Sequence, residues 1–182
     1  MFWLEVAVLA CLAFICYQDF RYRAVYWISF PLLCLLLLWL KCWQAGTENA
    51  IWHPIFGQSF FSLQLLLLWV YFSVKHKRPV NLTAAHLGWG DVLFLAVIPF
   101  YLSPVNFIAF YMGSLVLVLL WVAATQMSSN KLWSLNLAGH STTENLQIPL
   151  AGLQALMLGV IMILSLFLPQ IKLYSDDWFY GF

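Results

Sequence analysis

The sequence predicts an all-α, polytopic membrane protein with about six transmembrane helices and both termini outside. First, 64% of the 182 residues are hydrophobic and only 8% are charged, whereas a soluble domain carries roughly 25% charged residues. Second, long apolar stretches recur, and about 20 apolar residues span a bilayer as a helix. Third, basic residues gather in alternate loops. We therefore expect one domain over residues 1–182, with the lipid bilayer as its first partner.

Polar clusters and turn formers divide the chain into six apolar segments. The first, residues 2–18, lacks a basic n-region and an A-x-A-like cleavage site, so we expect a retained helix rather than a signal peptide. Residues 44–59 are rich in turn formers and predict a loop. Pro99 is expected to bend the fourth segment. The other apolar segments cover about 25–43, 59–74, 88–103, 105–124 and 148–168.

Basic residues set the predicted orientation of these segments. The loops after the first, third and fifth segments carry six of them: Arg21, Arg23, Lys75, Lys77, Arg78 and Lys131. The opposite side carries only Lys41 and Lys172. By the positive-inside rule, the basic loops are cytoplasmic. Tryptophans cluster near the predicted outer boundary, as in an aromatic belt: Trp3, Trp39, Trp43 and Trp178.

Two acidic residues fall at the cytoplasmic edge of this arrangement. Asp19 ends the first segment and Asp91 opens the fourth. Because these segments run in opposite directions, both carboxylates are expected at the same depth. An acid near membrane depth is costly and by default marks a functional site.

A pair of carboxylates in a small volume supports acid–base chemistry. The two cannot both ionise easily, so they hold one proton between them. One carboxylate can then activate a water as general base while the protonated one polarises a carbonyl, as in peptide hydrolysis without a covalent intermediate. The alternative is two interfacial charges: Asp91 favourable to a helix N-terminus, and Asp19 paired with Arg21 or Arg23.

Glycines precede the second acid in the stretch Gly88-Trp89-Gly90-Asp91. The absence of side chains at Gly88 and Gly90 would let a substrate backbone approach Asp91 closely in extended form. The alternative is that the two glycines only loosen the start of a helix.

These residues resemble the type IV prepilin peptidase family of GxGD-type membrane aspartyl proteases. Residues 88–91 match GxGD, residues 18–23 are similar to the family's first aspartate motif, and Ile148-Pro149-Leu150 opens the last segment similarly. The resemblance implies that Asp19 and Asp91 are catalytic. It implies a membrane aspartic endopeptidase that cleaves the short basic leader of prepilin-like proteins at the cytoplasmic face. It also implies a bacterial or archaeal cell (inner) membrane and a type IV pilus or secretion system.

The chain departs from the family in three places. Longer members carry a zinc domain with paired CxxC motifs, but the four cysteines here have no CxxC spacing. A minimal, peptidase-only form without methyltransferase activity is therefore expected. Val25-Tyr26-Trp27 stands where members often have an Ile-Pro-Asn-like end, and Val92 where many have lysine. These changes bear on the substrate and leave open an inactive scaffold or assembly protein.

Other polar residues indicate no further chemistry. The histidines, His53, His76, His86 and His140, lack ligand spacing, so neither a metal nor an organic cofactor is expected. The basic cluster at 75–78 is typical of a topology signal and of anionic-lipid contact, and no nucleic-acid partner is expected. Gln64 and Gln154 are predicted to form interhelical hydrogen bonds. The sequence leaves the oligomeric state unknown.

Overall fold

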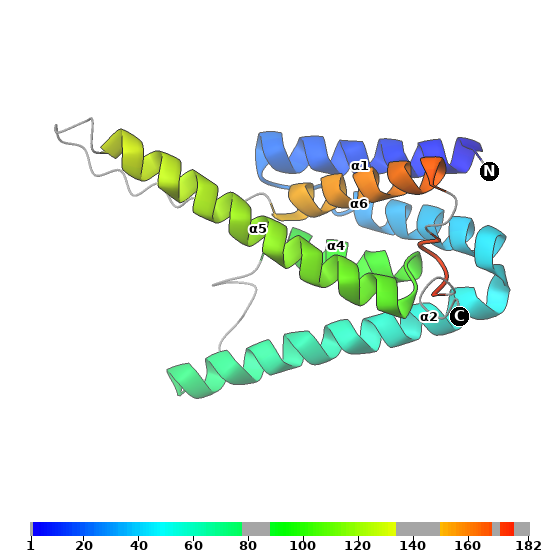
Figure 1. Ribbon diagram of the computed structural model, residues 1–182. Coiled ribbons are helices and arrows are strands. Elements are labelled where there is room, and N and C mark those ends of the chain that lie inside the picture. The colour runs from blue at the N-terminus through cyan, green and yellow to red at the C-terminus, as the bar shows by residue number, and fades with distance from the viewer. Residues whose placement is uncertain (1, 78–87, 134–149, 169–171, 177–182) are drawn as a thin grey trace.

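The computed structural model describes residues 2–77, 88–133, 150–168 and 172–176. Within these ranges the chain is helical and has no strand. The helices, in order, are α1 (Phe2–Tyr22), α2 (Ser29–His76), α4 (Trp89–Val97), the 3-10 helix η1 (Ile98–Phe100), α5 (Pro104–Trp133) and α6 (Leu150–Phe167) (Figure 1).

The predicted loop at 44–59 is wrong, because α2 is helical on both sides of Gly46. Gly46 alone leaves the helix, with φ 82° and ψ 166°, and the chain reverses direction there (Figure 1). Turn preferences are weak and are overridden by tertiary packing, and the buried residues after Gly46 recur at helical spacing on one face: Ala50, Pro54, Gly57 and Phe61. The second and third predicted segments are therefore parts of the two arms of α2: a first arm, residues 29–45, and a second arm, residues 47–76.

Pro99 interrupts the fourth segment as expected. The α-helix α4 is only 9 residues long, and the chain then tightens into the three residues of η1. At 1.5 Å per residue, α4 is about 14 Å long, which is less than half the hydrocarbon thickness of about 30 Å.

Helices α5 and α6 follow the last two predicted segments with different fidelity. Helix α6, at Leu150–Phe167, lies within the predicted range. Helix α5 continues to Trp133, into the stretch that we predicted as polar connection. Within the described ranges, four helices have an apolar stretch long enough to cross a membrane: α1, α2, α5 through Trp121, and α6.

The core is built from one stripe of each helix. On α1, Val8, Leu12 and Ile15 are buried at i, i+4 and i+7, the spacing that places residues on one helix face. Helix α2 repeats this spacing with Leu33, Leu37 and Leu40, and α6 with Ala151, Ala155, Leu158 and Met162. Helix α1 packs against both α2 and α6.

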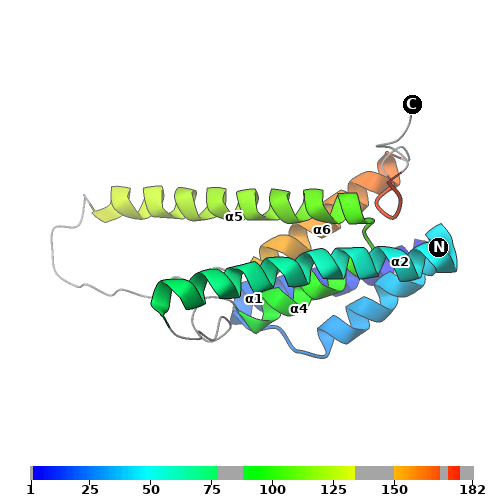
Figure 2. The same ribbon diagram turned by 90° about the horizontal axis from the view of Figure 1, so that it is seen from below.

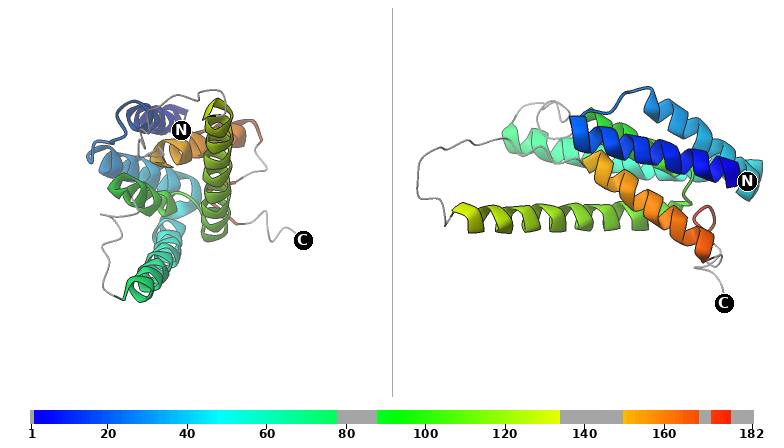
Figure 3. Two further views of the ribbon diagram at one scale, coloured as in Figure 1. Left: turned by 90° about the vertical axis from the view of Figure 1, so that its left-hand side faces the viewer. Right: turned by 90° about the horizontal axis from the view of Figure 1, so that it is seen from above.

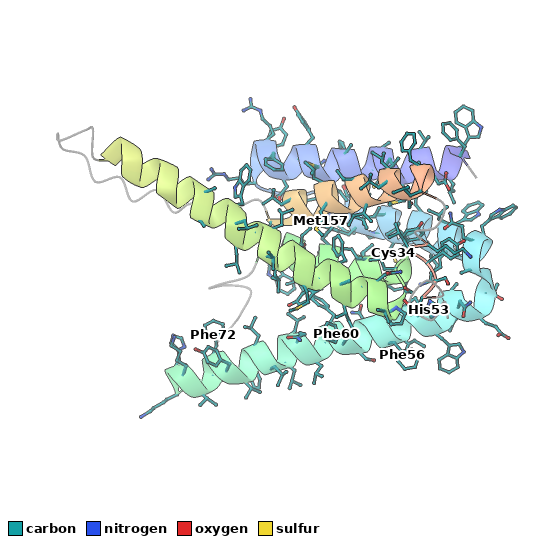
Figure 4. All side chains as sticks on the ribbon, viewed as in Figure 1. Cys34, His53, Phe56, Phe60, Phe72 and Met157 are labelled. Carbon is teal, nitrogen blue, oxygen red and sulfur yellow. The ribbon has the colours of Figure 1, made fainter. Side chains whose placement is uncertain are left out.

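Aromatic and polar side chains join α5 to the rest of the bundle. Phe60 of α2 points toward α5, where its ring meets Phe107 and Tyr111 edge to face, with centroids 6.3 Å and 6.0 Å away (Figure 4). Gln154 of α6 donates to the Ser114 hydroxyl of α5 at 3.4 Å, so its predicted interhelical hydrogen bond is confirmed. Gln64 forms no such bond to another described residue.

The outer surface of the described helices is largely apolar. Large hydrophobic side chains are exposed on α1, α2, α5 and α6, Trp3 by 82%. A soluble monomer rarely exposes contiguous patches beyond a few hundred Å², so this surface suits lipid. Of the four predicted belt tryptophans, Trp3, Trp39 and Trp43 are exposed, and Trp178 lies outside the described residues.

The bundle has two distinct ends. One end, where α1 finishes and α4 and α6 begin, carries Asp19 and Asp91, and we call it the carboxylate end (Figures 1 and 3). At the opposite end, which we call the tail end, α1 begins, α6 finishes and residues 172–176 lie (Figures 1 and 3). Helix α5 and the second arm of α2 diverge toward the carboxylate end (Figures 1 and 2).

Candidate active site

The packing register of α1 turns Asp19 toward the interior of the bundle. Asp19 follows Val8, Leu12 and Ile15 at the next i+4 position and continues their buried stripe. Its side chain is 8% exposed. The predicted first segment ended at residue 18, but α1 continues to Tyr22, so Asp19 belongs to the last turns of the helix and takes its direction from it.

Asp91 lies in the first turn of α4. Gly88 is the N-cap residue, with extended backbone (φ −68°, ψ 138°), and its carbonyl accepts the N–H groups of Asp91 and Val92 at 3.2 Å and 3.3 Å. The Asp91 side chain is partly buried. The glycine stretch therefore starts the helix and sets the position of the acid within it.

The start of α6 brings the two acids together. The backbone N–H of Ala151 donates to Asp91 Oδ1 at 2.8 Å, and the next N–H, of Gly152, donates to Asp19 Oδ2 at 2.5 Å. Two consecutive amides of one helical turn thus bind two carboxylates that are 72 positions apart in the sequence. The carboxylates are close enough to interact electrostatically.

Opposing forces act on the charge of this pair. The unpaired N–H groups and positive end of α6 favour anions. Removal from water and like-charge repulsion disfavour two full negative charges. A single proton on the pair would satisfy both demands, because it would leave one anion for the amides and remove the repulsion. Such a pair contains a base and an acid at the same time.

Glycines make room for both carboxylates. A Cβ atom at Gly88 would lie 2.9 Å from Asp91 Oδ2, and one at Gly152 would lie 3.1 Å from Asp19 Oδ2. A Cβ atom at Gly90 would meet only Phe30 Cζ, at 3.9 Å, an ordinary contact. A side chain at position 88 would thus displace the Asp91 carboxylate, whereas one at position 90 would not.

The alternative of two separate interfacial charges is weakened for one acid. Asp19 turns to α6, and the described residues contain no ion pair between it and Arg21 or Arg23. Asp91 does occupy the first turn of a helix, where a negative charge is favourable. That placement is compatible with both readings.

The sequence did not identify Ala151 and Gly152 as part of the site. They act through backbone amides, which every residue except proline carries, so no side chain marks them. The available signal was Gly152 three residues after Pro149, at a predicted helix start whose first N–H groups are free. Pro149 itself lies outside the described residues.

Loop geometry also supports the end of α1. Gln18 is buried, and its Oε1 accepts the N–H of Tyr26 at 3.1 Å. This bond fixes the connection to α2 next to Asp19. No group of three His, Cys, Asp or Glu side chains within the described ranges could hold a metal ion; His86 and His140 lie outside them.

Comparisons with protein-family models, with curated proteins and with solved structures found no match to this chain.

Proposed function

We propose that this chain is a membrane aspartic endopeptidase of the GxGD type, with Asp19 and Asp91 as its catalytic pair. The observation that supports it is the pair of adjacent α6 amides that receive one carboxylate each, at 2.5 Å and 2.8 Å. One carboxylate would be enough to cap the start of α6, and a second one adds like-charge repulsion, which supports a pair that holds a proton between its members.

The proposed reaction is direct attack of water on a peptide carbonyl. The ionised carboxylate removes a proton from water as its oxygen bonds to the carbonyl carbon, and the protonated carboxyl donates its proton to the carbonyl oxygen. The resulting diol gives one hydroxyl proton back to the pair as the C–N bond breaks, and the leaving nitrogen takes a proton from the pair. The products are a carboxyl group and an amine, and the pair returns to its shared-proton state.

The proposed topology has six crossings, with both termini outside and the carboxylates facing the cytoplasm. Helix α2 has 48 residues and would extend about 72 Å if straight, more than twice the hydrocarbon thickness of about 30 Å. Its reversal at Gly46 therefore suits two crossings. The positive-inside rule places the basic residues after α1 and at the end of α2 in the cytoplasm, in a bacterial or archaeal cell membrane.

The proposed substrate is a prepilin-like protein with a short basic leader before an apolar helix, as in the family that the sequence resembles. Helix α5 and the second arm of α2 diverge toward the carboxylate end (Figure 1), and both helices expose apolar side chains, such as Leu119 and Leu67. An apolar substrate segment suits these surfaces. The proposed role in a type IV pilus or secretion system follows from this substrate class.

The test is cleavage of such a substrate by the purified chain in liposomes. Asp19→Asn and Asp91→Asn keep the shape of each side chain but remove its acid–base function, so we expect each to lower turnover by at least about 10³-fold. Glu48→Gln, an exposed acid on α2, is the matched control and should cleave normally. Folding would be checked by thermal unfolding, and the cut site by mass spectrometry.

Two outcomes would contradict the proposal. Turnover that survives either aspartate substitution would exclude an aspartyl mechanism. No turnover by the wild type on several leader sequences would favour a catalytically inactive scaffold or assembly protein.

A further inference from the structure

A cavity of about 200 Å³ opens at the tail end, away from the catalytic pair. Its walls come from α1, α2, the turn before α5, α6 and the segment 172–176. Its polar lining includes Glu5, Gln44, Tyr101, Ser165 and Lys172. The proposed peptidase reaction uses none of these residues.

One wall of the cavity holds a carboxylate in place. The Tyr101 hydroxyl donates to Gln44 Oε1 at 3.3 Å, and Gln44 Nε2 donates to Glu5 Oε1 at 3.3 Å. The chain of bonds therefore ends on an acceptor, and no cation among the described residues forms an ion pair with Glu5. This wall presents an oriented anion, which suits a ligand ammonium.

The cationic side chain of Lys172 lines another part of the cavity wall. Lys172 is exposed, while its backbone is fixed because Asn106 Nδ2 donates to the carbonyls of Lys172 and Leu173, both at 3.1 Å. The cavity thus combines one anionic and one cationic side chain, with apolar surface from residues such as Leu9, Met162 and Leu166.

The cavity lies where lipid headgroups would be expected. It forms between the beginning of α1 and the end of α6, both of them long apolar helices. Phe2, Trp3 and Trp43 are exposed at this end, and tryptophans of this kind sit at headgroup level. A lipid bound here would contact the polar residues of the cavity with its headgroup and the apolar residues with its acyl chains.

We propose that this cavity binds the headgroup of an ethanolamine phospholipid, with its ammonium at Glu5 and its phosphate at Lys172. The ammonium carries N–H donors for the carboxylate, whereas the trimethylammonium of a choline lipid carries none. The site should therefore select ethanolamine over choline lipids, although both contain the phosphate.

The test uses native mass spectrometry of the full chain after delipidation in detergent. Equal amounts of ethanolamine, choline and glycerol phospholipids with identical acyl chains would be added. We expect about tenfold more ethanolamine than choline lipid bound to the wild type, the effect of one charge-assisted hydrogen bond.

Substitutions at Glu5 and Lys172 test which residue is responsible for the preference for ethanolamine over choline lipids. Glu5→Gln keeps an acceptor for Gln44 and should reduce the ethanolamine-to-choline ratio to about one, whereas Glu48→Gln, outside the cavity, should leave it unchanged. Lys172→Gln changes only an exposed side chain, and it should weaken both lipids together because they share the phosphate.

Three results would overturn the proposal. They are a wild type without preference, a Glu5→Gln variant that keeps the preference, and displacement of the lipid by an equal concentration of free phosphoethanolamine. The last result would identify a soluble ligand rather than a lipid.

Discussion

At the tail end of the bundle, polar side chains donate hydrogen bonds, mostly to backbone carbonyls. At the carboxylate end, backbone N–H groups donate to side-chain carboxylates. Asn106 Nδ2 donates to the carbonyls of Lys172, Leu173 and Ser175, and the Ser103 hydroxyl donates to Asp176. Lys41, which is 0% exposed, donates to the Leu102 carbonyl at 2.9 Å. His53 of α2 lies at this end as well (Figure 4). Helix α5 and the turn before it are thereby joined to the last described segment, and α2 is joined to that turn.

At the carboxylate end the described helices are joined more sparsely. Two amides of α6 hold Asp19 and Asp91, while α5 and the second arm of α2 diverge (Figures 1 and 2). Buried polar networks rigidify a structure, and regions with few buried contacts open more easily. The difference indicates a bundle anchored at one end, with its proposed catalytic pair at the end that has more freedom to admit a chain.

After the two aspartate substitutions, the largest effect on the carboxylate end is expected from Gly152→Ala. The new Cβ atom would lie 3.0 Å from Phe20 Cδ2 and 3.1 Å from Asp19 Oδ2, so the carboxylate must move. Displacement of a reacting group by about 1 Å can cost about 100-fold in rate, and we expect a 10- to 100-fold (order-of-magnitude) loss of turnover. Gly159→Ala is the matched control on the same helix, because its Cβ atom would meet nothing within 4 Å. Equal turnover of the two variants would refute the role of Gly152.

A smaller effect separates the two glycines of the GxGD stretch. A Cβ atom at Gly88 meets Asp91 Oδ2 at 2.9 Å, but one at Gly90 meets only Phe30 at 3.9 Å. We expect Gly88→Ala to lower kcat about tenfold by displacing the acid. Gly90→Ala should retain kcat, and any loss should appear in KM if a substrate passes there. A larger kcat loss for Gly90→Ala than for Gly88→Ala would contradict this assignment.

Lys41→Met should affect the tail end without affecting the chemistry. It removes the donor to the Leu102 carbonyl and leaves that buried acceptor unsatisfied, which costs about 1–3 kcal/mol. We expect a lower Tm at unchanged turnover below it, measured by thermal unfolding and cleavage in the same liposomes. Lys77→Met, at an exposed position, is the control. If Lys41→Met abolished cleavage in folded protein, the two ends would not be independent.

The smallest effect is expected between the two ends, at Gln154. Its hydrogen bond to Ser114 Oγ is long, at 3.4 Å, and its Oε1 has no partner among the described residues. Interhelical hydrogen bonds in membranes average about 0.6 kcal/mol. Gln154→Leu should therefore change the free energy of unfolding by no more than about that amount, measured by denaturant titration in detergent. A loss of several kcal/mol would reveal a larger polar role for this residue.

The positions of Asp19 and Asp91 at one end of the bundle were predictable from the order of the apolar segments along the sequence. The placement of Asp19 and Asp91 follows from the alternation of apolar segments, and the buried face of α1 carries Asp19 inward. The helix at 44–59 was not predictable from turn formers, because the packing of one helix face, which includes Ala50, Pro54 and Gly57, overrides local turn preferences. Ala151 and Gly152 escaped because their contribution is an amide, which leaves no compositional trace.

The bend at Gly46 makes the chain length between the two arms of α2 critical. Each residue of a helix turns the next by about 100°. One inserted residue near position 46 would therefore rotate the whole second arm about its axis. Gly57, whose added Cβ would lie 2.7 Å from Pro99, and Phe61, now buried, would then face lipid. Surface loops ordinarily tolerate insertions. At Gly46, by contrast, the insertion of a single residue would change which face of the second arm packs against the bundle.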